Sequence, residues 1–199
     1  AGDTLVGHFT NRLDEPTTIH WHGLRVPANM DGAPHSQEPV APGATFEYRF
    51  TVPDAGTFWY HPHVHESVQM ERGLYGPIIV RGAQEPAADV EGVLVLDDLL
   101  LGADGQIAPT GDLLEQHNGR EGGVSLVNGR AGAELLLRAG QRQRWRIVNA
   151  GSARFYRLAL PGHRFTVVGT DGGPVTTPHT EDELMLVPGD RLDVLVDGT

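Results

Sequence analysis

The residues of this chain whose types and spacing favour metal chemistry are the histidines of two short motifs. The first is His20-Trp21-His22, which Gly23 follows, and the second is His61-Pro62-His63. In an extended strand, residues two apart share a face, so each motif directs two imidazoles the same way, roughly 6.5 to 7 Å apart at the backbone. Neutral imidazole is the commonest protein ligand for copper and zinc. The two motifs therefore predict a nitrogen-rich metal site.

The other six histidines are not expected to bind metal. His65 shares the parity of His61 and His63, and we expect it to support the ligands by a hydrogen bond or to lie at the surface. Surface or packing roles are expected for the remaining five, which are His8, His35, His117, His163 and His179. Asp31 precedes Gly32 in a loop after the first motif, and because most Asp-Gly pairs form turns, the spacing alone assigns it no chemistry.

The sequence of the first half of the chain predicts short strands, and two of these would carry the histidine motifs. Glycine and proline are plentiful, 26 and 14 residues, which favours strands joined by turns over long helices. The strands that we expect here are Thr4–Thr10, Thr17–His22, Thr45–Val52, Thr57–His63 and Gly76–Arg81. Pro62 removes a donor from the sheet ladder, so the second motif should lie at an edge or rim. Residues 66–72 could form one short turn of helix.

A second set of strands follows a polar stretch. Residues 83–91 are predicted to be a linker between a domain of residues 1–82 and a domain of residues 92–199. The expected strands of the second domain are Gly92–Leu101, Val124–Val127, Glu134–Arg138, Gln143–Asn149, Arg154–Leu160, Arg164–Val168, Glu183–Val187 and Arg191–Val196, and residues 102–123 are expected to be a loop. The fold class is all-β, with two antiparallel β-sandwich or Greek-key barrel domains.

Composition excludes several classes of function. Hydrophobic residues make up 39% of the 199 residues, enough to bury a core. The net charge of −11 argues against a nucleic-acid surface, which needs clustered lysine and arginine. No run approaches the ~20 apolar residues that a membrane span needs. The chain has no cysteine, so disulfides, thiolate zinc sites and a blue-copper centre within it are excluded.

Longer motifs around the histidines resemble the laccase-like multicopper oxidases of the three-domain type. The run from Thr18 to Leu24, followed by Met30-Asp31-Gly32, resembles the first copper motif of that family, and the run from Gly56 to His63 resembles the second. Its continuation from Gln69 to Val80 is similar as well. Further similarities, to the second cupredoxin domain, are Leu126–Gly129, Arg144–Ala150, Asp171–Gly173 and Pro188–Arg191.

The resemblance implies two cupredoxin-like Greek-key domains that supply half of the ligands of a trinuclear copper cluster. His20 would bind the type 2 copper, and His22, His61 and His63 would bind the type 3 pair. Asp31 matches a family carboxylate that assists protons near the cluster. The family oxidises phenolic or metal-ion substrates by single electrons and reduces dioxygen to water. An extracytoplasmic protein, periplasmic or secreted, is also implied, although the start of this chain does not read as a signal peptide.

Two departures from the family pattern shape the expectation for the chain alone. The motifs of the C-terminal cupredoxin domain, which carries the other cluster histidines and the type 1 copper, are not found, and the first domain begins without its earliest strands. A C-terminal domain or a second chain should therefore supply the remaining ligands. We expect the isolated chain to show no blue absorption and no oxidase turnover.

Two alternatives stay open from the residues. One is a non-catalytic copper-binding module that uses His20, His22, His61 and His63. The other is a zinc hydrolase, in which three histidines and a water would perform Lewis-acid chemistry with Asp31 as the nearby base. Stoichiometric copper binding independent of a partner would favour the first, and zinc-dependent ester or phosphate hydrolysis the second.

Overall fold

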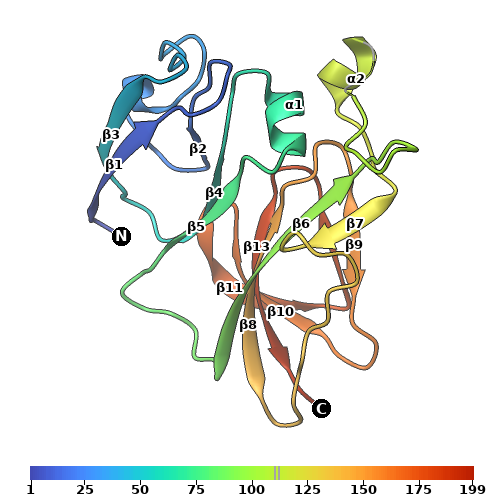
Figure 1. The fold of residues 1–199 in the computed structure, drawn as a ribbon. Coiled ribbons are helices and arrows are strands. Elements are labelled where there is room, and N and C mark those ends of the chain that lie inside the picture. Colours follow the sequence, from blue (N-terminus) through green and yellow to red (C-terminus); the bar gives the residue numbers. More distant parts are fainter. Residues whose placement is uncertain (110, 112) are drawn as a thin grey trace.

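The computed structural model describes residues 1–109, 111 and 113–199, and it is almost entirely β-structure (Figure 1). The predicted all-β fold is confirmed. The first half of the chain contains β1 (Thr4–Thr10), β2 (His20–His22), the 3-10 helix η1 (Ala28–Met30), β3 (Thr45–Thr51), β4 (Gly56–His61), α1 (Glu66–Glu71) and β5 (Gly76–Val80). The rest contains β6 (Val90–Leu99), α2 (Leu113–Asn118), β7 (Val124–Val127), β8 (Arg142–Asn149), β9 (Tyr156–Ala159), β10 (Phe165–Thr170), β11 (Gly173–Glu181), β12 (Glu183–Leu186) and β13 (Arg191–Asp197).

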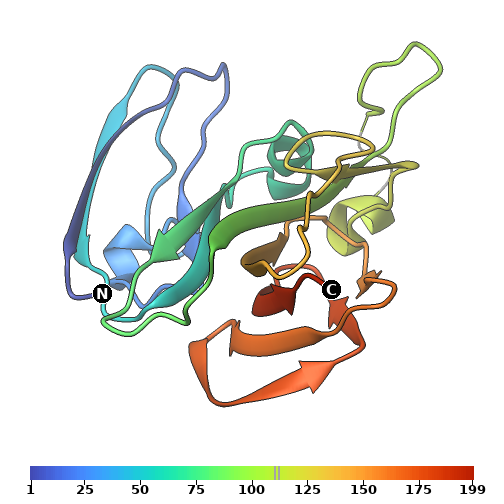
Figure 2. The same cartoon turned by 90° about the horizontal axis from the view of Figure 1, so that it is seen from below.

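The strands before residue 82 form two small sheets. β1 pairs antiparallel with β3, and β4 lies between β2 and β5 in a three-stranded sheet. Seen from below, the β1–β3 pair stands apart from β4 and β5, on the side away from the larger sheet (Figure 2). Trp21, Tyr48, Phe50 and Phe58 fill the space between these two sheets. Each sheet thus has one apolar face that the other covers.

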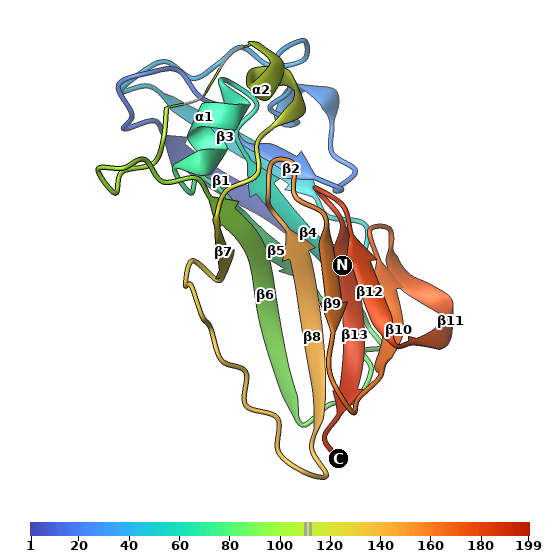
Figure 3. The same cartoon turned by 90° about the vertical axis from the view of Figure 1, so that its right-hand side faces the viewer.

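The later strands form a six-stranded sheet in the order β11-β10-β13-β8-β6-β7, with the pair β9–β12 beside it. Figure 3 shows β6, β8 and β13 as long neighbouring strands, with α1 and α2 above their upper ends. The core between the sheet and β9–β12 is centred on Trp145, Ile147, Phe165 and Leu186. β6 and β8 are parallel, so the expectation of purely antiparallel sheets is corrected at this pair.

β4, the strand that ends in the second histidine motif, is buried on both faces. Phe58 faces the core of the first two sheets, whereas Trp59 packs with Val95 and Val148 of the large sheet. The hydroxyl of Thr57 donates a hydrogen bond to the buried carboxylate of Asp193 in β13. The large sheet therefore supports the strand that carries His61. The division into domains at residues 82 and 92 stays a prediction, and β6 itself begins at Val90.

Several predicted elements differ from the structure. Residues 134–138 form no strand, because both edges of β8, the next strand in the chain, are taken by β6 and β13. The strand expected at 57–63 ends at His61, and Pro62 leaves His63 in the following turn. β11 and α2 were not predicted. None of the helices in the described part of the chain has the length and apolar character that crossing a bilayer takes.

Candidate metal centre

The structure brings the histidines of both motifs together. His20 and His22 lie on one face of β2, and the register of β2 with β4 sets His61 directly opposite His20. One ring nitrogen of each of these three residues lies within 4.8 Å of the others. His63 joins them from the turn after β4, with its ring centroid 4.7 Å from that of His20. A four-imidazole cluster results, as the motifs predicted.

Backbone carbonyl oxygens accept hydrogen bonds at Nδ1 of two of these rings, His20 and His61. His20 Nδ1 lies 2.9 Å from the carbonyl oxygen of Asp31 and 3.3 Å from its carboxylate. His61 Nδ1 lies 3.0 Å from the carbonyl oxygen of Pro62. An oxygen acceptor places the proton on Nδ1 and leaves Nε2 with its lone pair for a metal. His22 is turned the other way, with Nδ1 3.1 Å from Nε2 of His61.

Burial keeps two of the imidazoles neutral at physiological pH. Desolvation lowers the pKa of His22 to about 4, with the charge of Arg191 as a smaller cause. Desolvation likewise lowers the pKa of His61 to about 3. A metal ligand must offer an unprotonated nitrogen, so both rings are ready to bind without first losing a proton.

A cavity of about 390 Å³ opens beside the four histidines. Its walls come from both halves of the chain: Trp59, Glu66, Ser67 and Met70 on one side, and His117, Asn118, Gly119, Gly151, Ser152, Pro188 and Gly189 on the other. A β-carbon on Gly189 would lie 3.2 Å from Cε1 of His22, so a side chain at this position would crowd the ring. The cluster is therefore open to small molecules on one side.

Two residues at this site were missed by the sequence analysis. Glu66, at the start of α1, lies beside His61 and His63; its position three residues after His63 in a predicted helical turn was the available signal. Arg191 of β13 is buried behind the first motif, where it donates hydrogen bonds to the carbonyl oxygens of Thr57, Gly189 and Asp171. Arg191 ends the run Pro188–Arg191, whose resemblance to a second cupredoxin domain was the available signal, but only tertiary packing brings it to the first motif.

The other histidines do not join the cluster. His65 adopts a left-handed backbone conformation, with φ of 46°, and its Nδ1 lies 2.9 Å from Glu15 rather than beside the cavity. His117 is exposed but lines the cavity wall, which goes beyond the surface role expected for it. His8, His35 and His179 are exposed and His163 is half-buried, and none of these four is among the residues that line the cavity.

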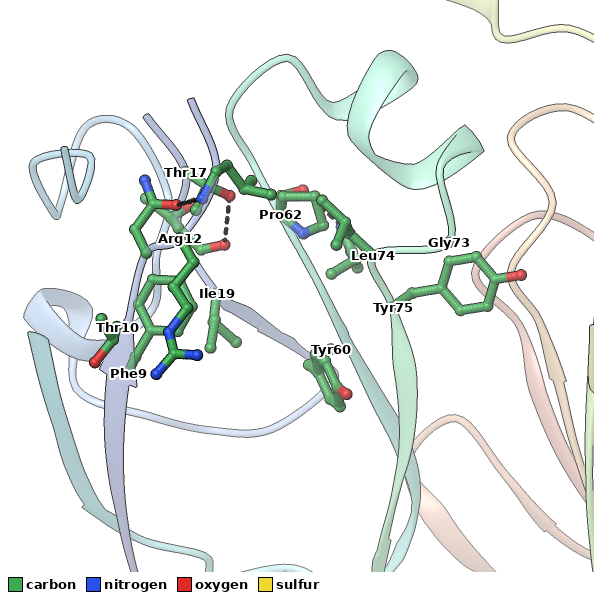
Figure 4. Close-up of a pocket in the computed structure, with 14 residues that line it drawn as sticks. Phe9, Thr10, Arg12, Thr17, Ile19, Tyr60, Pro62, Gly73, Leu74 and Tyr75 are labelled. Carbon is green, nitrogen blue, oxygen red and sulfur yellow. Dashed lines mark hydrogen bonds between the residues drawn. The ribbon is translucent and has the colours of Figure 1, made fainter. Parts of the chain in front are cut away.

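A second hollow, of about 280 Å³, lies on the opposite side of β4 (Figure 4). Phe9 and Arg12 come from the β1 side, and Tyr60 and Leu74 from the side of β4 and β5. Apart from His61, whose ring belongs to the cluster, its lining holds no metal-ligating side chain among the described residues.

Comparison with known proteins gives the family. Two models described as Multicopper oxidase match the chain, one over residues 1–85 and the other over residues 98–199. The chain belongs to the multicopper oxidase family. This confirms the resemblance that the histidine motifs predicted.

Individual multicopper oxidases are similar over almost the whole chain. Multicopper oxidase MmcO from Mycobacterium tuberculosis is 37% identical over 98% of this chain, which covers 44% of that protein. The crystal structure of a multi-copper oxidase from Pseudomonas thermotolerans superposes with a TM-score of 0.91 at 42% identity, covering 99% of this chain and 49% of that one. A metallo-oxidase from Campylobacter jejuni has a TM-score of 0.88 at 39% identity, covering 100% of this chain and 42% of that one. The chain thus spans less than half the length of these relatives.

Proposed function

We propose that His20, His22, His61 and His63 form half of the trinuclear copper site of an oxidase that oxidises substrates by single electrons and reduces dioxygen to water. The observation that carries the proposal is the convergence of four imidazoles beside an open cavity. The donor set fits copper, which favours imidazole nitrogen. Burial, which keeps His22 and His61 unprotonated, supports the same assignment.

The orientation of each ring suggests which nitrogen binds. His20 and His61 would bind through Nε2, because oxygen acceptors occupy the Nδ1 side of each ring. His22 would bind through Nδ1, which faces Nε2 of His61. On the family motif, His20 belongs to the type 2 copper, and His22, His61 and His63 belong to the type 3 pair.

The remaining parts come from outside this chain. A C-terminal cupredoxin domain or a second chain would supply the other cluster ligands and the type 1 copper, since this chain has no cysteine. Copper, when bound, supplies one-electron redox chemistry. The cavity would admit dioxygen, and the carboxylate of Asp31, 3.3 Å from His20 Nδ1, would hold a proton close to the cluster. Phenols or metal ions are the proposed reducing substrates, in an extracytoplasmic compartment.

Copper titration of the purified chain tests this proposal. The chain should bind copper at the cluster, give the electron paramagnetic resonance spectrum of nitrogen-coordinated Cu(II), and show neither an intense blue band nor phenol oxidation. His20→Ala and His61→Ala should each weaken binding strongly, whereas His179→Ala, at an exposed histidine, should not. Equal copper binding by all of these variants would refute the proposal.

A non-catalytic copper-binding module is the second candidate, favoured by the lack of cysteine in the chain. The two candidates differ in their dependence on a partner. A half-site should gain copper affinity and oxidase activity when the C-terminal domain is supplied. A carrier should bind copper tightly by itself and gain neither.

A further inference from the structure

The carboxylate of Glu66 lies close to two of the four histidines, His61 and His63. Its Oε1 is 3.3 Å from Nδ1 of His61, and its Oε2 is 3.4 Å from Nδ1 of His63. The carboxylate therefore lies between the two rings of the second motif. It approaches them from the Nδ1 side, and it also lines the cavity beside them.

We infer that Glu66 is a positioning residue that keeps the proton of His61 and His63 on Nδ1, so that both rings present Nε2 to the metal; this rests on the copper site proposed above. A carboxylate has two acceptor oxygens and no donor, so it can serve two N–H groups together. Partners of this kind fix the tautomer and orientation of metal-binding histidines.

The two histidines depend on Glu66 to different degrees. His61 Nδ1 has a second acceptor, the carbonyl oxygen of Pro62 at 3.0 Å, and its side chain is only 3% exposed. The side chain of His63 is 33% exposed and lies in the turn beyond β4. Among the described residues, the acceptor that faces His63 Nδ1 is Glu66. The tautomer of His63 should therefore respond to loss of Glu66, and that of His61 should persist.

Nuclear magnetic resonance of the metal-free chain, labelled with ¹⁵N in histidine, tests this inference. Long-range ¹H–¹⁵N spectra at neutral pH report which ring nitrogen carries the proton. His61 and His63 should both be Nδ1–H in the unmodified chain. In Glu66→Ala, His63 should move towards the Nε2–H form while His61 stays Nδ1–H. Unchanged tautomers of both rings in Glu66→Ala would overturn the inference.

Copper affinity gives the second measurement. Glu66→Ala should weaken copper binding about tenfold, the usual effect of losing a partner of a metal-binding histidine. Glu66→Gln should weaken it at least as much, because the amide NH₂ donates to one of the two rings and favours its Nε2–H form. If only the charge of Glu66 mattered, Gln and Ala would weaken binding equally, added salt would diminish both losses, and neither would change a tautomer.

Glu47→Gln is the matched control. Glu47 is an exposed carboxylate 3.4 Å from Nδ1 of His8, outside the cavity, so it reproduces the same contact away from the cluster. Its replacement should leave copper affinity unchanged. The measurements also separate this inference from the proposed function. Tautomer changes in a chain that binds no copper would support the role of Glu66 and refute the copper site, whereas copper binding that Glu66→Ala leaves unchanged would refute the role of Glu66 alone.

Discussion

Gly23 and Arg191 are packed so closely that a β-carbon on Gly23 would lie 2.2 Å from Nη2 of Arg191. Gly23 directly follows the first histidine motif, and Arg191 begins β13, the last strand of the chain. The guanidinium cannot move aside easily, because it is 5% exposed and donates to three carbonyl oxygens. The first motif is thus packed against the second half of the chain, at Gly23 as well as at His22, which lies beside Gly189.

Gly23→Ala should therefore lower both stability and copper affinity. The backbone φ of Gly23 is +87°, which disfavours any side chain, and the new methyl group would displace Arg191. Strain and overpacking together should reduce the free energy of unfolding by about 2–4 kcal/mol. Urea denaturation and copper titration measure the two effects.

Gly43→Ala is the control for Gly23→Ala. Gly43 has φ of +77°, but a β-carbon there meets nothing within 4 Å. Gly43→Ala should lower the free energy of unfolding by about 1–2 kcal/mol, through backbone strain alone, and should leave copper affinity unchanged. Equal losses of stability in the two variants, with copper affinity intact in both, would mean that the contact with Arg191 does not position the motif.

Arg146→Met should strongly destabilise the chain. Arg146 is fully buried in β8, and its Nη1 lies 2.9 Å from the carboxylate of Asp193, which also accepts from Thr57 in β4. Asp193 and Glu85 each pair with both Arg146 and Arg144, so the substitution leaves two carboxylates with one guanidinium. This excess of buried negative charge should cost about 3 kcal/mol. Urea denaturation measures it. Arg142→Met, at an exposed ion pair on the same strand, should have little effect, and a comparable loss there would contradict the account.

The free energy of unfolding of the metal-free chain should fall as the pH drops from about 6.5 to about 4.5. Unfolded histidine takes up a proton near pH 6.5, but the folded-state pKa values of His22 and His61 are about 4 and about 3. In this window the unfolded state binds more protons, so acid favours unfolding, by about 2 kcal/mol for each histidine.

Asp97 opposes this trend. Desolvation raises its pKa to about 6, so the folded state binds a proton more tightly than the unfolded state and gains stability as the pH falls through the same window. The net loss should be about 2 kcal/mol. Asp97→Asn should steepen the loss and His22→Gln should flatten it, as urea denaturation at several pH values would show. Identical slopes in all three proteins would contradict the assigned pKa directions.

Asp31→Asn should separate proton supply from metal binding. The carbonyl oxygen of Asp31, 2.9 Å from His20 Nδ1, survives the substitution and continues to orient His20. Copper affinity should therefore change little. In the complete oxidase, dioxygen reduction should slow at least about 100-fold, the range for loss of a group that transfers protons. A large loss of copper affinity would instead make Asp31 part of the metal site.

The sequence predicted the cluster because its geometry is mostly local. Alternation along β2 places His20 and His22 on one face, and the recognisable motif around His61 and His63 supplies the other pair. β1 and β7 were predicted with their observed bounds for the same reason, since their patterns are those of short paired strands.

The strands that were predicted wrongly or missed depend on strand pairing and tertiary packing, which a local sequence pattern does not show. The apolar run 134–138 looks like a strand, but both edges of β8, the next strand in the chain, are taken by β6 and β13. Leu136 instead accepts a hydrogen bond at its carbonyl oxygen from the side chain of Gln143. β11 contains Pro174 and Pro178, which argue against a strand, yet it forms at the sheet edge, where missing donors cost little. Arg191 reaches the first motif only because β13 packs near β4.

Anomalous diffraction at the copper edge, from crystals of the copper-loaded chain, tests the central claim most directly. Copper peaks should lie inside the cavity at coordination distance from Nδ1 of His22 and Nε2 of His61, about 2.0–2.1 Å as for imidazole bound to zinc. Copper bound only at exposed histidines such as His8 or His179, with the four-histidine cluster empty, would contradict it.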